Sequence, residues 1–195
     1  MSPNAGTASV SSTRSSVPAP HRSRRLSMAL IKQGRVLQDR WQTAETATEA
    51  LKPGAYFVSL ELWQAERELL RGKTAIGITL PNDTDPEVLA PDLDRIAAVA
   101  LRFPAFTDGR GFSQARTLRE HLGFRGEIRA EGPLIPDQHQ FLLRCGVDAV
   151  VVDDAADTGP WLAAARRYRS VYQPAADDRI PAYRGRHTAP QAIAS

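Results

Sequence analysis

Five short strand-like runs, separated by amphipathic segments, constrain the fold of this chain more than any other feature. The runs span residues 55–60, 74–80, 97–103, 126–132 and 148–154. The segments between them carry apolar residues at helical spacing and end in typical stops such as Gly123. Strands that alternate with helices predict an α/β fold, with a parallel sheet of about five strands and right-handed crossovers. Periodicity leaves open whether the sheet stays open or curls towards a partial (β/α) barrel.

Local features predict where some helices begin. Asp85 is a plausible N-cap, with Pro86 at the first helical position. Asp137 and Gln140 have the spacing of a capping box at the start of the next-to-last helix. Residues 28–50 are harder to assign, and an N-terminal hairpin around residues 31–41 is one interpretation.

Composition divides the chain into one domain and two tails. Residues 1–27 are rich in Ser, Pro, Ala and Arg, and such a segment cannot bury enough surface to offset its ordering entropy. We interpret it as a disordered extension before a start at Met28. A transit peptide and a twin-arginine signal are alternatives, although only Met28 to Ile31 would form the apolar region. Residues 174–195 read as a disordered tail, which leaves 28–173 as a single α/β domain.

Charge, length of apolar runs and cysteine usage exclude several classes of protein. The formal charge is +3, but residues 1–27 contribute +4 and residues 174–195 contribute +1, which leaves −2 for residues 28–173. A protein that binds a nucleic-acid backbone carries positive charge on its domain, so we expect no nucleic-acid partner. No run is long enough to span a membrane. A single cysteine, Cys145, forbids an internal disulfide and fits a reducing cytoplasm.

Polar residues concentrate where the predicted strands end. In parallel α/β sheets the functional crevice lies outside the carboxyl ends of the strands. The fourth strand adds a sharper observation, because Glu127, Arg129 and Glu131 alternate and so project to one face. Burying three charges is costly unless they pair. Either this face is an exposed edge, or the three charges join a network with Arg102, Arg110 or Asp108.

These residues favour an anion-binding site near the helix that follows the third strand. Backbone N–H groups at a Gly-Arg-Gly turn, a guanidinium and a hydroxyl suit a phosphate, sulfate or sulfonate group. In this interpretation Arg110 holds the anion, and two carboxylates orient the arginines. The candidate residues are Asp108, Gly109, Arg110, Gly111, Ser113, Arg129 and Glu131.

Three other chemistries were compared with the anion site. Gly109-x-Gly111 with Glu131 twenty residues later resembles a nicotinamide or flavin fingerprint, but Gln114 replaces its third glycine. Carboxylates at strand ends could hold Mg²⁺, but neighbouring arginines could equally neutralise them, so we predict no metal site. Cys145, at a helix end, fits a small buried hydrophobe better than a nucleophile. No catalytic residue and no cofactor is assigned. The carboxylates at strand ends that could hold Mg²⁺ are Asp108, Glu131, and Asp153 or Asp154.

Several longer motifs lie in the second half of the chain, at Phe103–Gly111, Ser113–Arg119, Gly126–Ala130, Asp137–Gln138 and Arg144–Gly146. In these motifs the chain resembles a bacterial family catalogued as domain of unknown function 934. Members are often labelled as oxidoreductases and are typically encoded beside sulfite reductase. The resemblance therefore implies an accessory protein of assimilatory sulfite or sulfate reduction, with sulfite reductase as a partner and sulfite or sulfate as the anion. The alternative is an NAD(P)- or flavin-dependent oxidoreductase of the same pathway.

Overall fold

A single curved sheet organises the molecule. The computed structural model describes residues 28–153, 156–168, 170–177 and 179–185. The predicted extension, residues 1–27, and the last ten residues of the predicted tail lie outside the described residues. Eight strands form the sheet: β1 (Met28–Lys32), β2 (Arg35–Gln38), β3 (Trp41–Thr43), β4 (Ala55–Ser59), β5 (Ile76–Leu80), β6 (Ala98–Arg102), β7 (Glu127–Glu131) and β8 (Ala149–Asp153).

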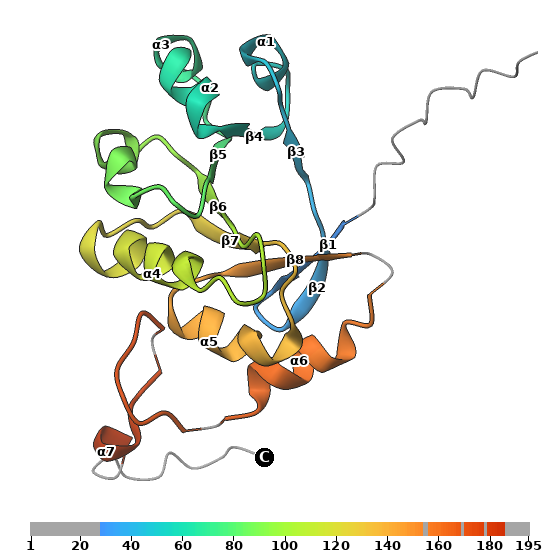
Figure 1. The fold of residues 1–195 in the computed structure, drawn as a ribbon, viewed down its shortest axis with the longest axis vertical. Coiled ribbons are helices and arrows are strands. Elements are labelled where there is room, and N and C mark those ends of the chain that lie inside the picture. The colour runs from blue at the N-terminus through green and yellow to red at the C-terminus, as the bar shows by residue number, and fades with distance from the viewer. Residues whose placement is uncertain (1–27, 154–155, 169, 178, 186–195) are drawn as a thin grey trace, which may run out of the picture.

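The order of the strands is β2-β1-β8-β7-β6-β5-β4-β3, so six consecutive strands from β3 to β8 are parallel neighbours (Figure 1). Strand β1 runs antiparallel to both β8 and β2. The β1–β2 turn consists of Gln33 and Gly34, both with positive φ, as a two-residue hairpin turn requires. The hairpin considered for this region is therefore present.

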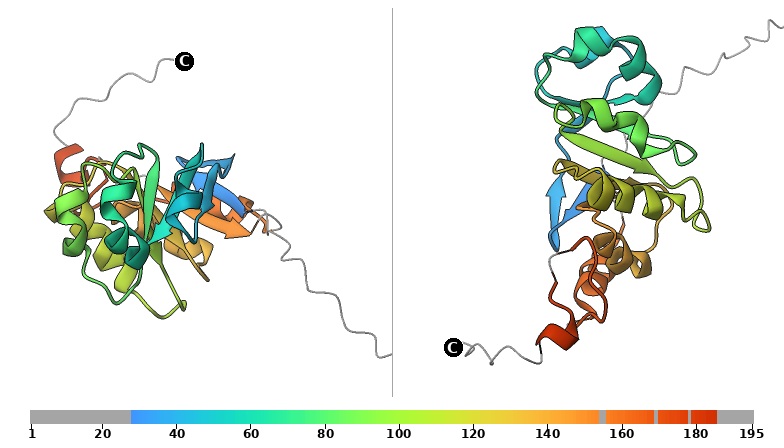
Figure 2. Two further views of the ribbon diagram at one scale, coloured as in Figure 1. Left: turned by 90° about the horizontal axis from the view of Figure 1, so that it is seen from above. Right: turned by 90° about the vertical axis from the view of Figure 1, so that its left-hand side faces the viewer.

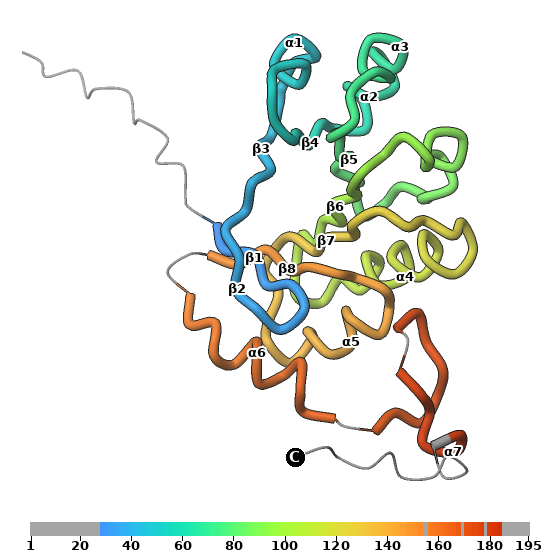
Figure 3. The backbone as a smooth tube through the Cα atoms, turned by 180° about the vertical axis from the view of Figure 1, so that it is seen from behind, coloured from blue at the N-terminus to red at the C-terminus, as the bar shows by residue number. Residues whose placement is uncertain are grey.

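A two-residue link explains why the sheet curls. Strands β2 and β3 are the two edges of the sheet, yet only Asp39 and Arg40 separate them in the chain. Seven strand spacings would place the edges about 34 Å apart in a flat sheet, whereas Gln38 and Trp41 can be at most about 11 Å apart. The sheet must therefore bend until its edges approach each other. Figure 3 shows the chain running from the β1–β2 hairpin directly into β3.

The result is a mixed α/β half-barrel with the helices outside the strands (Figure 1 and Figure 2). Along β1 and along β4 to β8, alternate side chains pack into the main core beneath the helices, as Ile76, Ile78, Val99 and Leu101 do. The helical segments are α1 (Ala47–Ala50), α2 (Leu60–Ala65), α3 (Arg67–Leu70), the 3-10 helix η1 (Pro86–Asp92), α4 (Arg110–Arg116), the π-helical turn η2 (Thr117–His121), the 3-10 turn η3 (Pro136–Gln138), α5 (His139–Arg144), α6 (Gly159–Arg166) and α7 (Ala182–Gly185).

Small residues on β5 and β6, among them Gly77, Ala98 and Ala100, leave room on the concave face for larger side chains. Ala98, Ala100 and Phe57 form a separate buried cluster there, against which Trp41 packs. Gly77 makes this packing possible, because a Cβ at this position would lie 2.5 Å from the Phe57 ring and 2.9 Å from the Trp41 ring. The two aromatic rings therefore lie over the backbone of β5.

The α/β class is confirmed, but the predicted strand number is wrong, because the sheet has eight strands rather than about five. All five predicted strands are present, each within two residues of its expected bounds. The sheet also contains the β1–β2 hairpin and β3. Strand β3 has only three residues and little buried surface, so it lacks the alternation by which strands are predicted.

Two predicted helix starts have different outcomes. Asp85 is the N-cap and its side chain accepts from the N–H of Glu87, 3.0 Å away, but the segment is a 3-10 helix that contains Pro91. The capping box predicted at Asp137 and Gln140 is wrong. The turn begins at Pro136, and Asp137 instead accepts from Nη1 of Arg167 at 3.0 Å.

Part of the segment assigned to a C-terminal tail has defined contacts. Val171 pairs with Pro181 in an isolated bridge, and α7 follows directly. Asp177 accepts from Nη1 of Arg144 at 2.7 Å. Within the described part of the chain, no helix has both the length and the apolar character to cross a membrane.

Candidate functional site

Arg129, in the middle of the central strand β7, is the most deeply buried charged side chain on the concave face. It is 2% exposed. Its position follows from the alternation seen in the sequence, since Ile128 and Ala130 enter the core beneath the helices while Arg129 points the other way. The predicted charged face of this strand is therefore largely covered, and it is not an exposed edge.

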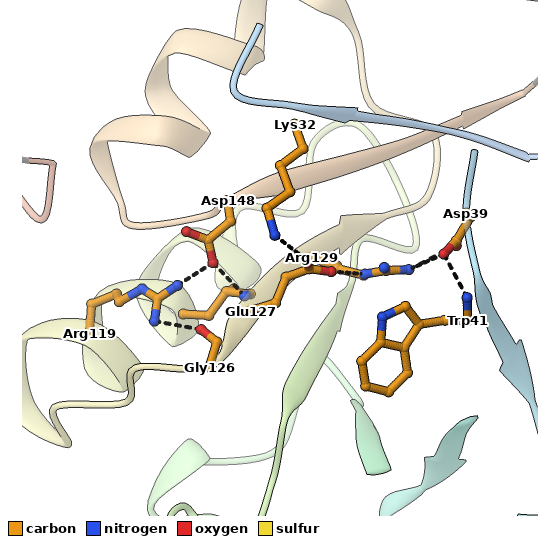
Figure 4. A network of polar contacts seen from close by, with 9 residues as sticks. Lys32, Asp39, Trp41, Arg119, Gly126, Glu127, Arg129 and Asp148 are labelled. Carbon is orange, nitrogen blue, oxygen red and sulfur yellow. Dashed lines mark hydrogen bonds and ion pairs between the residues drawn. The ribbon is translucent and has the colours of Figure 1, made fainter. Parts of the chain in front are cut away.

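Two carboxylates and two aromatic rings surround the Arg129 guanidinium, and Figure 4 shows Asp39, Glu127 and Trp41 of this group. Nη1 donates to both carboxylate oxygens of Asp39, at 2.9 and 2.8 Å, and Nε donates to Glu127. The guanidinium carbon lies 5.4 Å from the centre of the Trp41 ring and 5.1 Å from that of Phe57. Such compensation is what a buried charge requires.

This network joins distant parts of the chain. Glu127 also accepts a hydrogen bond from Lys32 of β1. Burial alone would raise the pKa of Glu127, but the hydrogen bonds from Lys32 and Arg129 outweigh burial and lower it. Asp39 comes from the link between β2 and β3, so its bond to Arg129 fixes that link to the central strand. The sequence predicted a network for these charges with Arg102, Arg110 or Asp108 as partners. Of these, Arg102 pairs with Glu131 at 3.7 Å, whereas Arg110 and Asp108 pair with each other.

A pocket of about 1260 Å³ opens beside this network, at the carboxyl ends of β6, β7 and β8. Its place is the one at which α/β sheets usually bind ligands. The charged side chains that line it come from strand ends and from the β2–β3 link, and the apolar ones come mainly from the sheet face, the loop after β7 and α6. The charged residues are Asp39, Arg40, Arg102, Glu131 and Asp153, and the apolar ones include Trp41, Phe57, Leu134, Val151 and Trp161.

Glu131 is a partly buried carboxyl group of the pocket, and its side chain is 23% exposed. Burial raises its pKa, and the charges of Arg102 and Arg129 oppose this rise only in part. Its closest cation is Arg102, whose Nη1 lies 3.7 Å from Oε2. That separation is an ion pair but exceeds hydrogen-bond range. Glu131 is therefore protonated more readily than an ordinary glutamate.

Arg40 and Arg102 place two guanidinium groups in the pocket, and most of their hydrogen-bond donors have no partner among the described residues. Among the described residues, neither guanidinium donates a hydrogen bond, and Arg40 has no ion pair. Each guanidinium has five N–H donors in a planar fork that matches an oxyanion. A ligand with an oxyanion group would satisfy donors that otherwise face solvent.

The predicted Gly-Arg-Gly turn lies at the start of α4, and its arginine is already paired. Oδ1 of Asp108 accepts from the backbone N–H and Nε of Arg110, at 3.2 and 3.0 Å, and Oδ2 accepts from Nη2 at 2.6 Å. Asn82 Nδ2 donates to the same Oδ2 at 2.6 Å. These bonds from Arg110 lower the pKa of Asp108 to about 2. The carboxylate occupies the place that an anion would take on Arg110.

The other predicted residues of this turn are a helix cap, an exposed serine and a closely packed glycine. Gly109 is the N-cap of α4, and Ser113 is exposed. Gly111 is buried against Phe103, the residue that follows β6, and a Cβ at this position would lie 2.4 Å from the Phe103 ring. Close packing therefore explains this glycine without a phosphate.

The seven predicted residues fall into two groups. Asp108, Gly109, Arg110, Gly111 and Ser113 lie around the start of α4, whereas Arg129 and Glu131 lie on the concave face of β7. No hydrogen bond or ion pair among the described residues joins the groups, and residues 108–113 do not line the pocket that contains Glu131. Only Glu131 of the predicted residues lines that pocket, with Arg129 beside it.

The described residues give little support to thiol catalysis by Cys145 or to a metal site. Burial raises the pKa of Cys145 to about 11, so its thiol is protonated at neutral pH. His139 is buried, and its Nδ1 lies 2.8 Å from the carbonyl oxygen of Trp161. No group of three or more His, Cys, Asp or Glu side chains in the described part of the chain could hold a metal ion.

Sequence reasoning missed the pocket residues that come from the β2–β3 link and from the helix α6. Asp39, Arg40 and Trp41 lie in the segment that was difficult to assign, and Trp161 lies at the start of α6. One signal in the sequence could have located the link. If the chain passes from the hairpin into the first parallel strand within two residues, the two edges of the sheet must lie close together. The charges beside Trp41 could then be placed near the strand ends.

The comparisons with known proteins agree with the resemblance seen in the sequence. The model of a family described as bacterial protein of unknown function (DUF934) matches residues 77–183, which extend from β5 to the start of α7. A search of the curated proteins found no match. Since the family match covers more than half of the 195 residues, the chain belongs to the DUF934 family.

Proposed function

We propose that this protein is an accessory protein of assimilatory sulfite or sulfate reduction that binds a sulfur oxyanion in the concave pocket. The observation that carries the proposal is the presence of Arg40 and Arg102 in a pocket at the carboxyl ends of the strands, with hydrogen-bonding capacity that the described residues leave unused. The family resemblance supports the pathway and supports sulfite reductase as the partner.

Each charged residue of the pocket has a role in this proposal. Arg102 and Arg40 hold the oxyanion through charge-assisted hydrogen bonds. Glu131, in its neutral form, donates a further hydrogen bond, and this is favoured because burial raises its pKa. Arg129 keeps the pocket wall in place through Asp39. This assignment moves the anion from Arg110, which Asp108 neutralises, to Arg102.

An NAD(P)- or flavin-dependent oxidoreductase is the alternative. Gly109 and Gly111 are the residues that suggested it, and the packing of Gly111 on Phe103 supplies another reason for that glycine. NADPH and FMN can be tested in the same thermal unfolding assay as the anions. A clear rise in melting temperature with either cofactor would favour the enzyme over the accessory protein.

The direct test of anion binding is thermal unfolding with sodium sulfite or sodium sulfate at constant ionic strength. An anion at a hundred times its dissociation constant stabilises the folded state by about 2.7 kcal/mol, which is about 5 °C or more for a chain of this size. We expect this rise in the parent protein and its loss in Arg102→Gln. Arg110→Gln, the matched control, should retain it. A parent protein that responds to neither salt would refute the proposal.

The pathway is tested separately in cells. A deletion strain should grow poorly with sulfate or sulfite as its only sulfur source and normally with cysteine. The tagged protein should recover sulfite reductase from lysate. Normal growth on sulfate together with no recovery would remove the pathway from the proposal and leave the anion site to be judged by the binding assay.

A further inference from the structure

The pocket is larger than an inorganic oxyanion needs. Its volume of about 1260 Å³ exceeds the range of roughly 300–1000 Å³ in which pockets enclose drug-sized molecules. Sulfite or sulfate alone would contact the two arginines and leave most of this space to water. The dimensions of the pocket therefore fit a ligand with a body as well as a charged group.

The walls of the pocket are divided by chemistry. Arg40 and Arg102 provide the cationic groups, from the β2–β3 link and the end of β6. The carboxylates of the pocket are Asp39, which is paired with Arg129, and Glu131 and Asp153 at the ends of β7 and β8. Leu134, Val151 and Trp161 provide an apolar part, from the loop after β7, the face of β8 and the start of α6.

The apolar part is not explained by the binding of a bare anion. Val151 and Trp161 are buried and Leu134 is half-buried, so these side chains are held by the fold and do not need to move to receive a ligand. Apolar walls with a few convergent polar groups are typical of sites for organic ligands, in which the apolar walls supply affinity and the polar groups fix orientation. Removing apolar ligand surface from water here would add binding free energy that a bare anion cannot gain.

We propose that the pocket takes an organic anion, in which a sulfonate or similar oxyanion is carried on an apolar body about the size of one or two rings. The oxyanion lies at Arg102 and Arg40, and the apolar body lies against Leu134, Val151 and Trp161. This inference rests on the proposed anion site and names the class of ligand that fills it.

The test compares three probes on the purified full chain by calorimetric titration: sodium sulfate, naphthalene-2-sulfonate and the uncharged naphthalene-2-sulfonamide. Naphthalene-2-sulfonate should bind roughly tenfold or more tightly than sulfate, because its rings gain the apolar wall. Arg102→Gln should weaken sulfate and the sulfonate alike. Leu134→Gln should weaken only the sulfonate. Leu69→Gln, the same substitution at a 53% exposed leucine of α3 outside this pocket, should change neither.

The possible outcomes separate this inference from the proposed function. If sulfate and naphthalene-2-sulfonate bind equally well and both depend on Arg102, the anion site stands and the organic ligand is refuted. If the sulfonamide binds as well as the sulfonate, the apolar wall binds without the charged group and the organic anion is refuted, and the anion site then stands or falls with the dependence of sulfate binding on Arg102. If none of the three probes binds, both proposals fail as well. Circular dichroism of each variant confirms folding before titration.

Discussion

At the scale of single residues, Arg129 shows how a fully buried charge can define a fold. Its partners Asp39 and Glu127 lie on both sides of the guanidinium, and Trp41 and Phe57 contact its faces. Arg129, which the alternation on β7 places on the concave face, thus holds the β2–β3 link against the central strand of the half-barrel.

Replacing Arg129 by methionine should destabilise the protein strongly. The substitution leaves Asp39 and Glu127 without their buried cation, which typically costs about 3–5 kcal/mol of unfolding free energy. Arg116→Met is the matched control, because Arg116 forms an exposed ion pair with Glu120, and such pairs contribute about 1 kcal/mol or less. Urea denaturation measures both. Equal losses in the two variants would show that the Arg129 network does not stabilise the fold.

The pKa of Asp108 provides a second test at this scale. The side-chain hydrogen bonds from Arg110 lower it from 3.8 to about 2. In NMR titration its carboxyl carbon should therefore change near pH 2, and in Arg110→Gln it should change at a higher pH. Since the folded pKa lies below the unfolded one, the stabilisation from this pair is present above the unfolded value and is lost as pH falls towards 2. An unshifted titration in the parent protein would contradict the paired geometry.

The pH dependence of anion binding tests the role of Glu131. Burial raises its pKa, and the neutral acid neither repels an anion nor competes for Arg102. Sulfate binding should therefore strengthen as pH falls through the pKa of Glu131 and weaken as pH rises above it. Glu131→Gln should bind sulfate with little pH dependence, as measured by calorimetry. Binding to the parent protein that is constant with pH would exclude Glu131 from the site.

At the scale of elements, the sequence predicted best those strands that are buried on both faces. Strands β4, β5, β6 and β8 are nearly continuous apolar runs, and β7 was recognised despite three charges because those charges alternate. Strand β3 and the 3-10 character of η1 could not be predicted, because one is too short for periodicity and the other depends on Pro91.

The packing of α4 on β6 can be tested at Gly111. A Cβ at this position would lie 2.4 Å from the Phe103 ring, whereas a Cβ at Gly72 would meet nothing within 4 Å. Gly111→Ala should therefore lower the unfolding free energy by about 1–3 kcal/mol, and Gly72→Ala should change it by about 0.5 kcal/mol or less. Thermal or urea unfolding checks both. A neutral Gly111→Ala variant would mean that α4 does not approach the strand this closely.

At the scale of the whole molecule, the site depends on contacts that local sequence cannot reveal. Arg129 and Asp39 are 90 positions apart, and Lys32 and Glu127 are 95 apart. The alternation on β7 predicted that these charges need partners, but the curl of the sheet decides which partners they find. The same curl places Arg40 near Arg102 in one pocket. In the Gly-Arg-Gly turn, the most conspicuous local motif, Arg110 instead pairs with the neighbouring Asp108.

The most direct test of the account is the position of a bound oxyanion in a crystal of the full chain. Selenate, an analogue of sulfate, can be located through the anomalous scattering of selenium without reference to any assumed site. We predict an anomalous peak in the concave pocket, within hydrogen-bond distance of the Arg102 guanidinium. A peak at Arg110 beside the start of α4, with none at Arg102, would contradict the account.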